Sequence, residues 1–188
     1  IANKIVHLIT KKDVDARQIT AITFTNRAAN EMRERVMGLM ANKGLNRPTI
    51  STFHSLGLKI LRAESDNLGY RANFSIYDTN DCQDLLADLI RKNKLPDSIS
   101  VGQVQVQISD WKSSFIHTVQ NNQNQFSPLQ NKIWSVYTEY QETLLAYNAM
   151  DFDDLVVAPV KLFLSNKDCL KYWQKKINYL MVDEYQDT

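Results

Sequence analysis

The chain has 188 residues, of which 44% are hydrophobic and 23% charged, and its formal net charge is +1. The length suits one buried core, or a core with an inserted subdomain. The near-neutral charge excludes binding of nucleic acid through an overall basic field, so such contacts must come from local placement. Two cysteines, Cys82 and Cys169, exclude a disulfide framework. No apolar run approaches the ~18 residues of a membrane span, so we expect a cytoplasmic protein without membrane contact.

The amino-terminal third alternates helical and extended patterns. Apolar residues three and four apart predict helices, and β-branched and aromatic residues predict strands. We predict helices over 1–9, 26–40 and 54–64, and strands over 18–25 and 50–53. The first helix begins without a cap, as if it were entered part-way. In the second helix, Glu31 stands four residues before Arg35 and can pair with it, and Gly44 can close its end.

Residues 79–148 are helical throughout and interrupt this alternation. Thr79 or Asn80 can cap a first helix, and Ser127 followed by a proline can open the last one. Residues 121–125 are all asparagine or glutamine and predict a mobile polar connector. We therefore predict an inserted subdomain.

Near the end of the chain, a short apolar run over residues 179–182 stops at two adjacent carboxylates. Such a run is typical of a buried parallel strand that delivers the next side chains to a ligand-binding sheet edge. We expect Asp183 to hold a magnesium ion, and Glu184 to orient or deprotonate an attacking water. Strand alternation predicts that the two side chains lie on opposite sides. An isolated Asp-Glu pair after a strand is more often part of a solvated turn. The residues that follow Glu184 therefore decide between a turn and a functional site.

Two other strand ends carry candidate binding residues. Residues 23–32 run from a strand into a helix, and the free amides at such a junction suit a phosphate. Phe24 offers a surface on which a base can stack, although by itself it is more often a core residue. At the second strand end, Thr52 can cap a helix while His54 faces water, or both can contact a ligand. The acidic segment 151–155 is typical of the start of a helix, and we assign it a structural role in preference to a functional one.

Three segments together resemble the motifs of one family. Residues 182–188, Val-Asp-Glu-Tyr-Gln-Asp-Thr, resemble the Walker B box, the second helicase motif, of superfamily 1 DNA helicases of the UvrD, PcrA and Rep type. Residues 23–36 resemble motif Ia and residues 49–55 resemble motif Ib, which contact single-stranded DNA in that family. The resemblance spans essentially the whole chain, and residues 72–75 and 108–112 are most similar to the Rep type.

The resemblance implies an α/β fold: a RecA-like parallel-sheet ATPase core, here incomplete, with an inserted all-helical subdomain. Residues 1–78 and 149–188 would form domain 1A, and residues 79–148 subdomain 1B. It implies a motor that uses ATP and Mg²⁺ to move 3′ to 5′ along single-stranded DNA and to unwind duplexes in replication or repair. The implied partners are single-stranded DNA and duplex junctions, domains 2A and 2B of a longer chain, and replication or repair proteins.

Residue by residue, the resemblance implies that Asp183 is the magnesium-binding acid and Glu184 the catalytic base. Gln186 would sense the nucleotide and link it to the grip on DNA. The DNA-facing positions would be Phe24, Thr25, Asn26, Arg27, Thr52, Phe53 and His54. Arg27 stands where lysine is common in the family, and it keeps the charge.

Several parts of such a motor are missing from the sequence. No GxxxxGK[ST] pattern occurs, so the Walker A phosphate cradle and its lysine are absent, and motifs III to VI are absent too. Phosphoryl transfer depends on several parts acting together. We therefore expect a piece of a longer protein that by itself neither hydrolyses ATP nor unwinds DNA, and that binds DNA weakly.

Three alternatives remain from the sequence. The first is a UvrD- or PcrA-type repair helicase or the motor subunit of a helicase-nuclease, and the second is a non-enzymatic module that binds single-stranded DNA or docks a partner. The third is an unrelated α/β domain with an acidic strand end. The motor interpretation requires Asp183, Phe24 and His54 to converge on one edge of the folded sheet.

Overall fold

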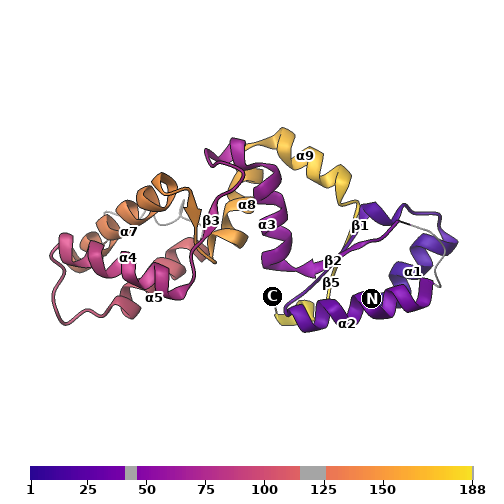
Figure 1. Ribbon diagram of the computed structural model, residues 1–188, viewed down its shortest axis with the longest axis horizontal. Coiled ribbons are helices and arrows are strands. Elements are labelled where there is room, and N and C mark those ends of the chain that lie inside the picture. The colour runs from indigo at the N-terminus through magenta and orange to yellow at the C-terminus, as the bar shows by residue number, and fades with distance from the viewer. Residues whose placement is uncertain (41–45, 115–125, 188) are drawn as a thin grey trace. The chain divides into compact units, whose positions relative to one another are not determined.

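The computed structural model describes residues 1–40, 46–114 and 126–187. The chain forms two compact units, one of Ile1–Lys59 with Val160–Thr188 and one of Ile60–Pro159. Figure 1 labels their helices and strands. The predicted subdomain 79–148 lies within the second unit, which also includes residues on both sides of it. The assignment of these boundaries to domain 1A and subdomain 1B stays a prediction.

The first unit is built on a parallel sheet with the strand order β2, β1, β5, which confirms the predicted α/β class. The strands are β1 (Ile19–Thr23), β2 (Thr49–Thr52) and β5 (Tyr179–Val182). The register pairs Thr23 with Thr52 and Ile22 with Val182, so all three strands end at the same edge. This edge, with the residues that follow each strand, is called the carboxyl edge below.

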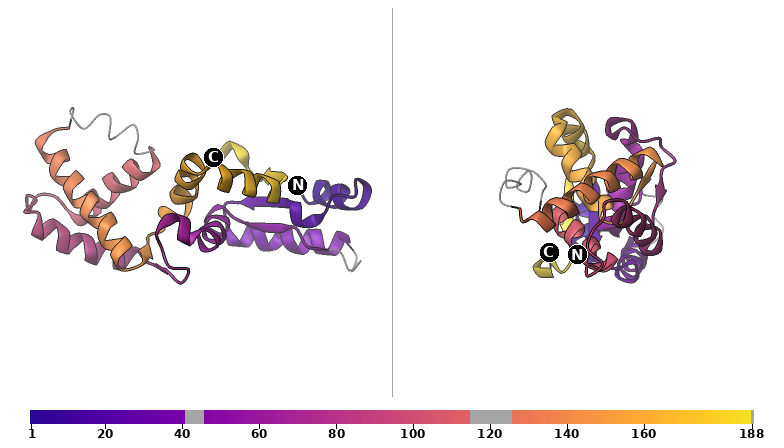
Figure 2. Two further views of the ribbon diagram at one scale, coloured as in Figure 1. Left: turned by 90° about the horizontal axis from the view of Figure 1, so that it is seen from above. Right: turned by 90° about the vertical axis from the view of Figure 1, so that its left-hand side faces the viewer.

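Helices cover both faces of this sheet. Helix α2 (Asn26–Met40) and helix α9 (Lys167–Lys176) lie on opposite sides of it (Figures 1 and 2), and α1 (Ala2–Lys11) packs beside α2. As predicted, no side chain caps α1. Every residue of β1 is buried, because β1 is the central strand. Apolar side chains of α1, α2 and the sheet form the core, among them Ile5, Ile19, Val36 and Ile50.

The prediction that the last strand is buried was wrong. Strand β5 pairs with β1 in parallel as expected, but Leu180 is 56% exposed and its neighbours in the strand are only partly buried. The apolar run predicts the strand correctly. It does not reveal that β5 is an edge strand among the described residues, with one neighbour instead of two.

The second unit is mainly helical. Its helices α4 (Thr79–Lys92), α5 (Val101–Ser113) and α7 (Pro128–Ala146) pack around buried apolar residues that include Leu86, Val104, Val136 and Leu144. They lie together in both views (Figures 1 and 2). A short parallel pair, β3 (Ser75–Ile76) and β4 (Ala149–Met150), joins the two ends of this unit. The 3-10 helix η2 (Ser65–Leu68) precedes β3, while α3 (Phe53–Ala63) and α8 (Asp154–Ser165) continue into the first unit.

Capping residues fix where the helices of the second unit begin. Ser127 accepts a hydrogen bond from the Gln130 amide, which confirms the predicted start of α7. The cap of α4 is Asp78, and not Thr79 or Asn80 as predicted, because the Asp78 carboxylate accepts from two amides of the first turn. Gly44 and the connector 121–125 lie outside the described residues.

A buried ion cluster joins three parts of the second unit. Lys112 of α5 is fully buried, and its Nζ lies 2.6 Å from Asp151 Oδ2 and 2.9 Å from Asp154 Oδ1. The Tyr140 hydroxyl of α7 donates to the same Asp151 oxygen at 3.0 Å. Burial lowers the pKa of Lys112, but the two carboxylates outweigh it and raise the pKa overall. The acidic segment 151–155 thus has the structural role that the sequence indicates, as the anchor of α5 and α7.

Candidate functional site

The three predicted strand tips meet at the carboxyl edge. The Asp183 amide donates to the Ile22 carbonyl at 2.8 Å, which extends the pairing of β5 with β1 by one bond. Phe24 and Phe53 follow the paired residues Thr23 and Thr52, and their ring centroids lie 5.4 Å apart. His54 comes directly after Phe53 in the first turn of α3. The convergence that the motor interpretation requires is therefore present in the first unit.

Asp183 lines a cavity of about 210 Å³ that sequence reasoning did not predict. The cavity is formed by the start of α1, by α2 and by Asp183, and Glu31 and Arg35 of α2 line it. The sequence had indicated Glu31 and Arg35 only as an ion pair along the helix. Because Ala28, Met32 and Arg35 follow helical spacing, that face of α2 could have been assigned to the site from sequence. The structure thus adds a cation and a second carboxylate beside Asp183.

Glu184 occupies a turn instead of the strand. Strand β5 ends at Val182, and Glu184 has a φ of 51°, in the left-handed region that residues other than glycine rarely adopt. The Asp187 amide donates to the Glu184 carbonyl at 2.8 Å, and the Gln186 side chain donates to the Glu184 carboxylate. The turn therefore sets the direction of the Glu184 side chain. The sequence had predicted that strand alternation would set it. Gln186 and Glu184, both predicted site residues, are directly joined.

The predicted DNA-contacting residues after β1 are all exposed. Phe24 is 43% exposed, and Thr25, Asn26 and Arg27 also face solvent. Thr25 is also structural, because its hydroxyl accepts from the Ala28 amide at 3.1 Å and so caps α2. Arg27 pairs with Glu31 through a 2.8 Å contact between exposed side chains. The hydrogen bond to Glu31 raises the pKa of Arg27, and this pair replaces the Glu31–Arg35 pair that the spacing suggested.

The predicted residues after β2 are less exposed. Thr52 is buried, and its hydroxyl donates to Ser55 Oγ at 3.0 Å and accepts from the Ser55 amide at 3.2 Å. Thr52 is therefore the cap of α3 that the sequence allowed as an alternative. Phe53 and His54 are half-buried. Of the Phe24 and Phe53 rings, Phe24 presents the larger exposed surface for stacking.

The donor set at Asp183 bears on which metal the site can hold. No group of three or more histidine, cysteine, aspartate or glutamate side chains suited to a metal occurs in the described part of the chain. Mg²⁺ is commonly held by one or two carboxylates together with phosphate oxygens and water, not by an all-protein cage. Asp183 and Glu31, with Arg35 to face a phosphate, fit that pattern.

Sequence comparison decides the family. The family model of the UvrD/REP helicase N-terminal domain matches residues 1–188. The chain belongs to this family. This confirms the resemblance found in the three sequence motifs. As a member of the UvrD/REP family, the chain has the partial RecA-like α/β fold that the carboxyl edge and the parallel sheet indicate.

Relatives of this UvrD/REP domain are similar along its whole length. The chain is 42% identical to the ATP-dependent DNA helicase Rep of Escherichia coli (strain K12) and 41% identical to the ATP-dependent DNA helicase Rep of Buchnera aphidicola subsp. Baizongia pistaciae, over 188 residues in each case. It is 35% identical to the ATP-dependent DNA helicase PcrA of Bacillus subtilis (strain 168) over 189 residues. All of the chain is covered, but it spans only 28% of each Rep protein and 25% of PcrA.

Proposed function

We propose that this chain is part of an ATP-dependent DNA helicase of superfamily 1, which couples ATP hydrolysis to 3′ to 5′ movement on single-stranded DNA and to duplex unwinding. The observation that carries the proposal is the meeting of Asp183, Glu184 and the Phe24–Phe53 pair at one edge of a parallel sheet. Membership of the UvrD/REP family and the helicase names of the relatives support it. The same proposal includes a role for this activity in DNA replication or repair.

The nucleotide side of the proposal concerns the cavity beside Asp183. Mg²⁺ bound with ATP would neutralise charge on the phosphates. Asp183 would hold that ion directly or through its water, and Arg35 would face phosphate oxygens. Glu184 would orient the attacking water and accept its proton, while Gln186, bonded to Glu184, would register the state of the nucleotide. The Walker A lysine and the arginine of a second RecA-like domain would come from elsewhere in the complete protein.

The DNA side of the proposal concerns the exposed residues after β1 and β2. Phe24 would stack on a base, and Phe53 would support its ring from the side. Arg27 and the free amides at the start of α2 would attract the backbone phosphates.

Among the described residues, no helix has the length and apolar character needed to cross a membrane. A cytoplasmic location remains part of the proposal.

Replacing Phe24 by alanine in the complete protein will weaken binding of single-stranded DNA by about tenfold, because base stacking contributes about 1–3 kcal/mol per base. Fluorescence anisotropy with a labelled oligonucleotide measures this. Tyr172→Ala is the matched control, since Tyr172 is an exposed aromatic residue on α9, outside the carboxyl edge. Equal affinity of Phe24→Ala and the unchanged protein would remove Phe24 from the DNA contact.

The isolated 188-residue chain will hydrolyse no ATP and unwind no duplex, and it will bind single-stranded DNA only weakly. The reason is that the Walker A lysine and motifs III to VI are not in the sequence. Phosphate release with and without single-stranded DNA, measured beside the complete protein, tests this. DNA-stimulated turnover by the isolated chain would contradict the expectation. A complete protein that binds single-stranded DNA without turnover would favour the non-enzymatic binding module.

A further inference from the structure

The second unit has a cavity that the proposed helicase activity does not use. It measures about 390 Å³ and opens between α4, α5 and the turn that precedes α8. Its floor is made of buried side chains, among them Cys82, Leu86, Ile108 and Tyr140. A concave site of this size accommodates one or two large apolar side chains. None of the lining residues belongs to the carboxyl edge.

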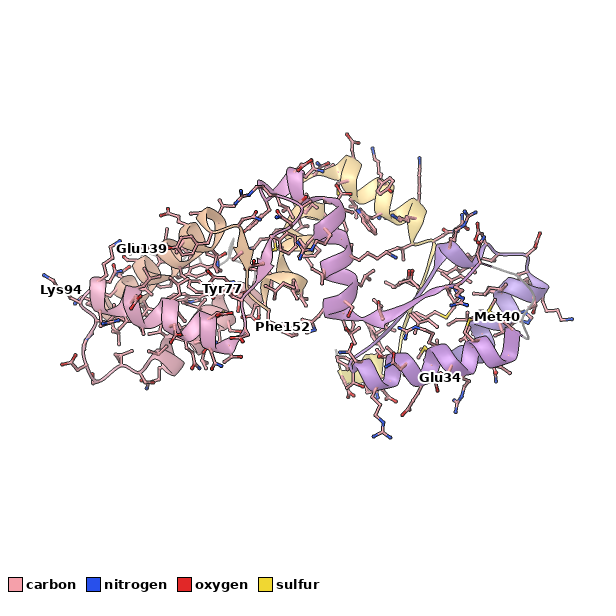
Figure 3. The ribbon with its side chains drawn as sticks, in the orientation of Figure 1. Glu34, Met40, Tyr77, Lys94, Glu139 and Phe152 are labelled. Carbon is pink, nitrogen blue, oxygen red and sulfur yellow. The ribbon has the colours of Figure 1, made fainter. Side chains whose placement is uncertain are left out.

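Apolar side chains stand exposed at the mouth of this cavity. Val106 of α5 is 62% exposed and Phe152 is 58% exposed, and both line the cavity with Tyr77. Figure 3 labels Tyr77 and Phe152, which come from the segments on either side of the helical block. Large apolar side chains that gather at a cavity mouth mark a surface where another molecule docks, whereas single exposed apolar residues are common.

The same surface is acidic. Asp78 and Asp153 line the cavity, and Asp78 is exposed to solvent. The basic residues of α4 lie in its last turn, at the other end of the helix. The described lining residues include no lysine, arginine or histidine. The cavity therefore disfavours nucleic acid, whose phosphates carry the same charge, and favours a cationic partner.

The walls of the cavity are held in place before anything binds. Gln83 of α4 donates to Gln105 of α5 at 3.2 Å, so a hydrogen bond joins the two helices that form the cavity. On the floor, the Tyr140 hydroxyl donates to Asp151, whose charge is already matched by the buried Lys112. Because these side chains are fixed in the protein alone, binding requires little ordering of the protein, which favours affinity.

We propose that this cavity is a docking site for a partner protein that presents a positively charged, amphipathic helix. An apolar side chain of the helix enters between Val106 and Phe152, and its lysines or arginines lie against Asp78 and Asp153. This is the helix-in-groove mode of recognition, in which apolar anchors give affinity and charges select the partner. The proposal concerns the second unit alone and does not depend on the proposed ATPase activity.

The test uses the complete protein and three labelled synthetic peptides. The first is an amphipathic helix of leucine and lysine, the second replaces its lysines by glutamates, and the third replaces its leucines by serines. Fluorescence anisotropy should give the tightest binding for the first peptide, with each of the others at least about tenfold weaker. Val106→Lys should weaken the first peptide by about tenfold or more, because it removes an apolar anchor and adds a repelling charge.

Leu145→Lys is the matched control. Leu145 is 46% exposed on α7 and does not line the cavity, so this variant should bind the first peptide like the unchanged protein. Far-ultraviolet circular dichroism of both variants verifies the fold. Equal binding by Val106→Lys, or equal binding of the serine and leucine peptides, would overturn the proposal. So would self-association of the protein that Val106→Lys abolishes, since the site would then belong to a second copy.

Discussion

Replacing Glu184 by glutamine in the complete protein will abolish ATP turnover and leave nucleotide binding intact. General-base catalysis typically contributes about 10²–10⁴-fold to a rate, and glutamine cannot accept the proton of an attacking water. Glutamine keeps the size of the side chain and its ability to accept the hydrogen bond from Gln186. Because Glu184 is exposed in a turn and is not among the described residues that line the Asp183 cavity, the change should not disturb the nucleotide contacts.

Two measurements separate the possible outcomes for Glu184. Steady-state phosphate release gives turnover, and equilibrium titration with a fluorescent ATP analogue in the presence of Mg²⁺ gives binding. Glu34→Gln is the matched control, because Glu34 is an exposed carboxylate of α2 in the same unit (Figure 3) and lies outside the cavity lining. If Glu184→Gln loses nucleotide binding as well, Glu184 holds the metal or the fold and is not the base.

Local sequence signals predicted the frame of the site because they act over short distances. The change from strand to helical spacing at residues 23–26 and 52–54 located two tips, and the acids after residue 182 located the third. Parallel pairing then brings the tips to one edge by geometry alone. The role of Gln186 nevertheless came from family resemblance alone, and the roles of Asp183, Glu184 and Gln186 all stay predictions.

Other features could not be predicted because their causes are not local. The left-handed φ of Glu184 depends on the turn that follows β5, and an apolar strand pattern does not encode it. The exposure of Leu180 depends on which strands lie beside β5. Lys112 looks like any lysine on an amphipathic helix, yet its partners Asp151 and Asp154 come 39 and 42 residues later. Only the folded chain reveals such a cluster.

Replacing Lys112 by methionine will lower the free energy of unfolding of the second unit by about 3–5 kcal/mol, because breaking a buried ion pair leaves uncompensated buried charge. Asp151 and Asp154 would keep their burial and lose their only cation among the described residues. Urea unfolding followed by tryptophan fluorescence measures the loss, since Trp111 and Trp134 are in contact within this unit. Lys92→Met is the control: Lys92 is 69% exposed and pairs with Glu139, so it should cost less than about 1 kcal/mol.

The loss caused by Lys112→Met should shrink as the pH falls. Burial raises the pKa of Asp154 to about 6 even with Lys112 present, whereas Lys112 outweighs burial and lowers the pKa of Asp151. Without Lys112 both pKa values rise, so between about pH 4, the unfolded value, and those raised values the folded variant binds more protons than its unfolded chain. Stability of the variant therefore increases as the pH falls through that window. A loss equal to that of Lys92→Met, or one that does not depend on pH, would mean that Lys112 does not neutralise the two aspartates.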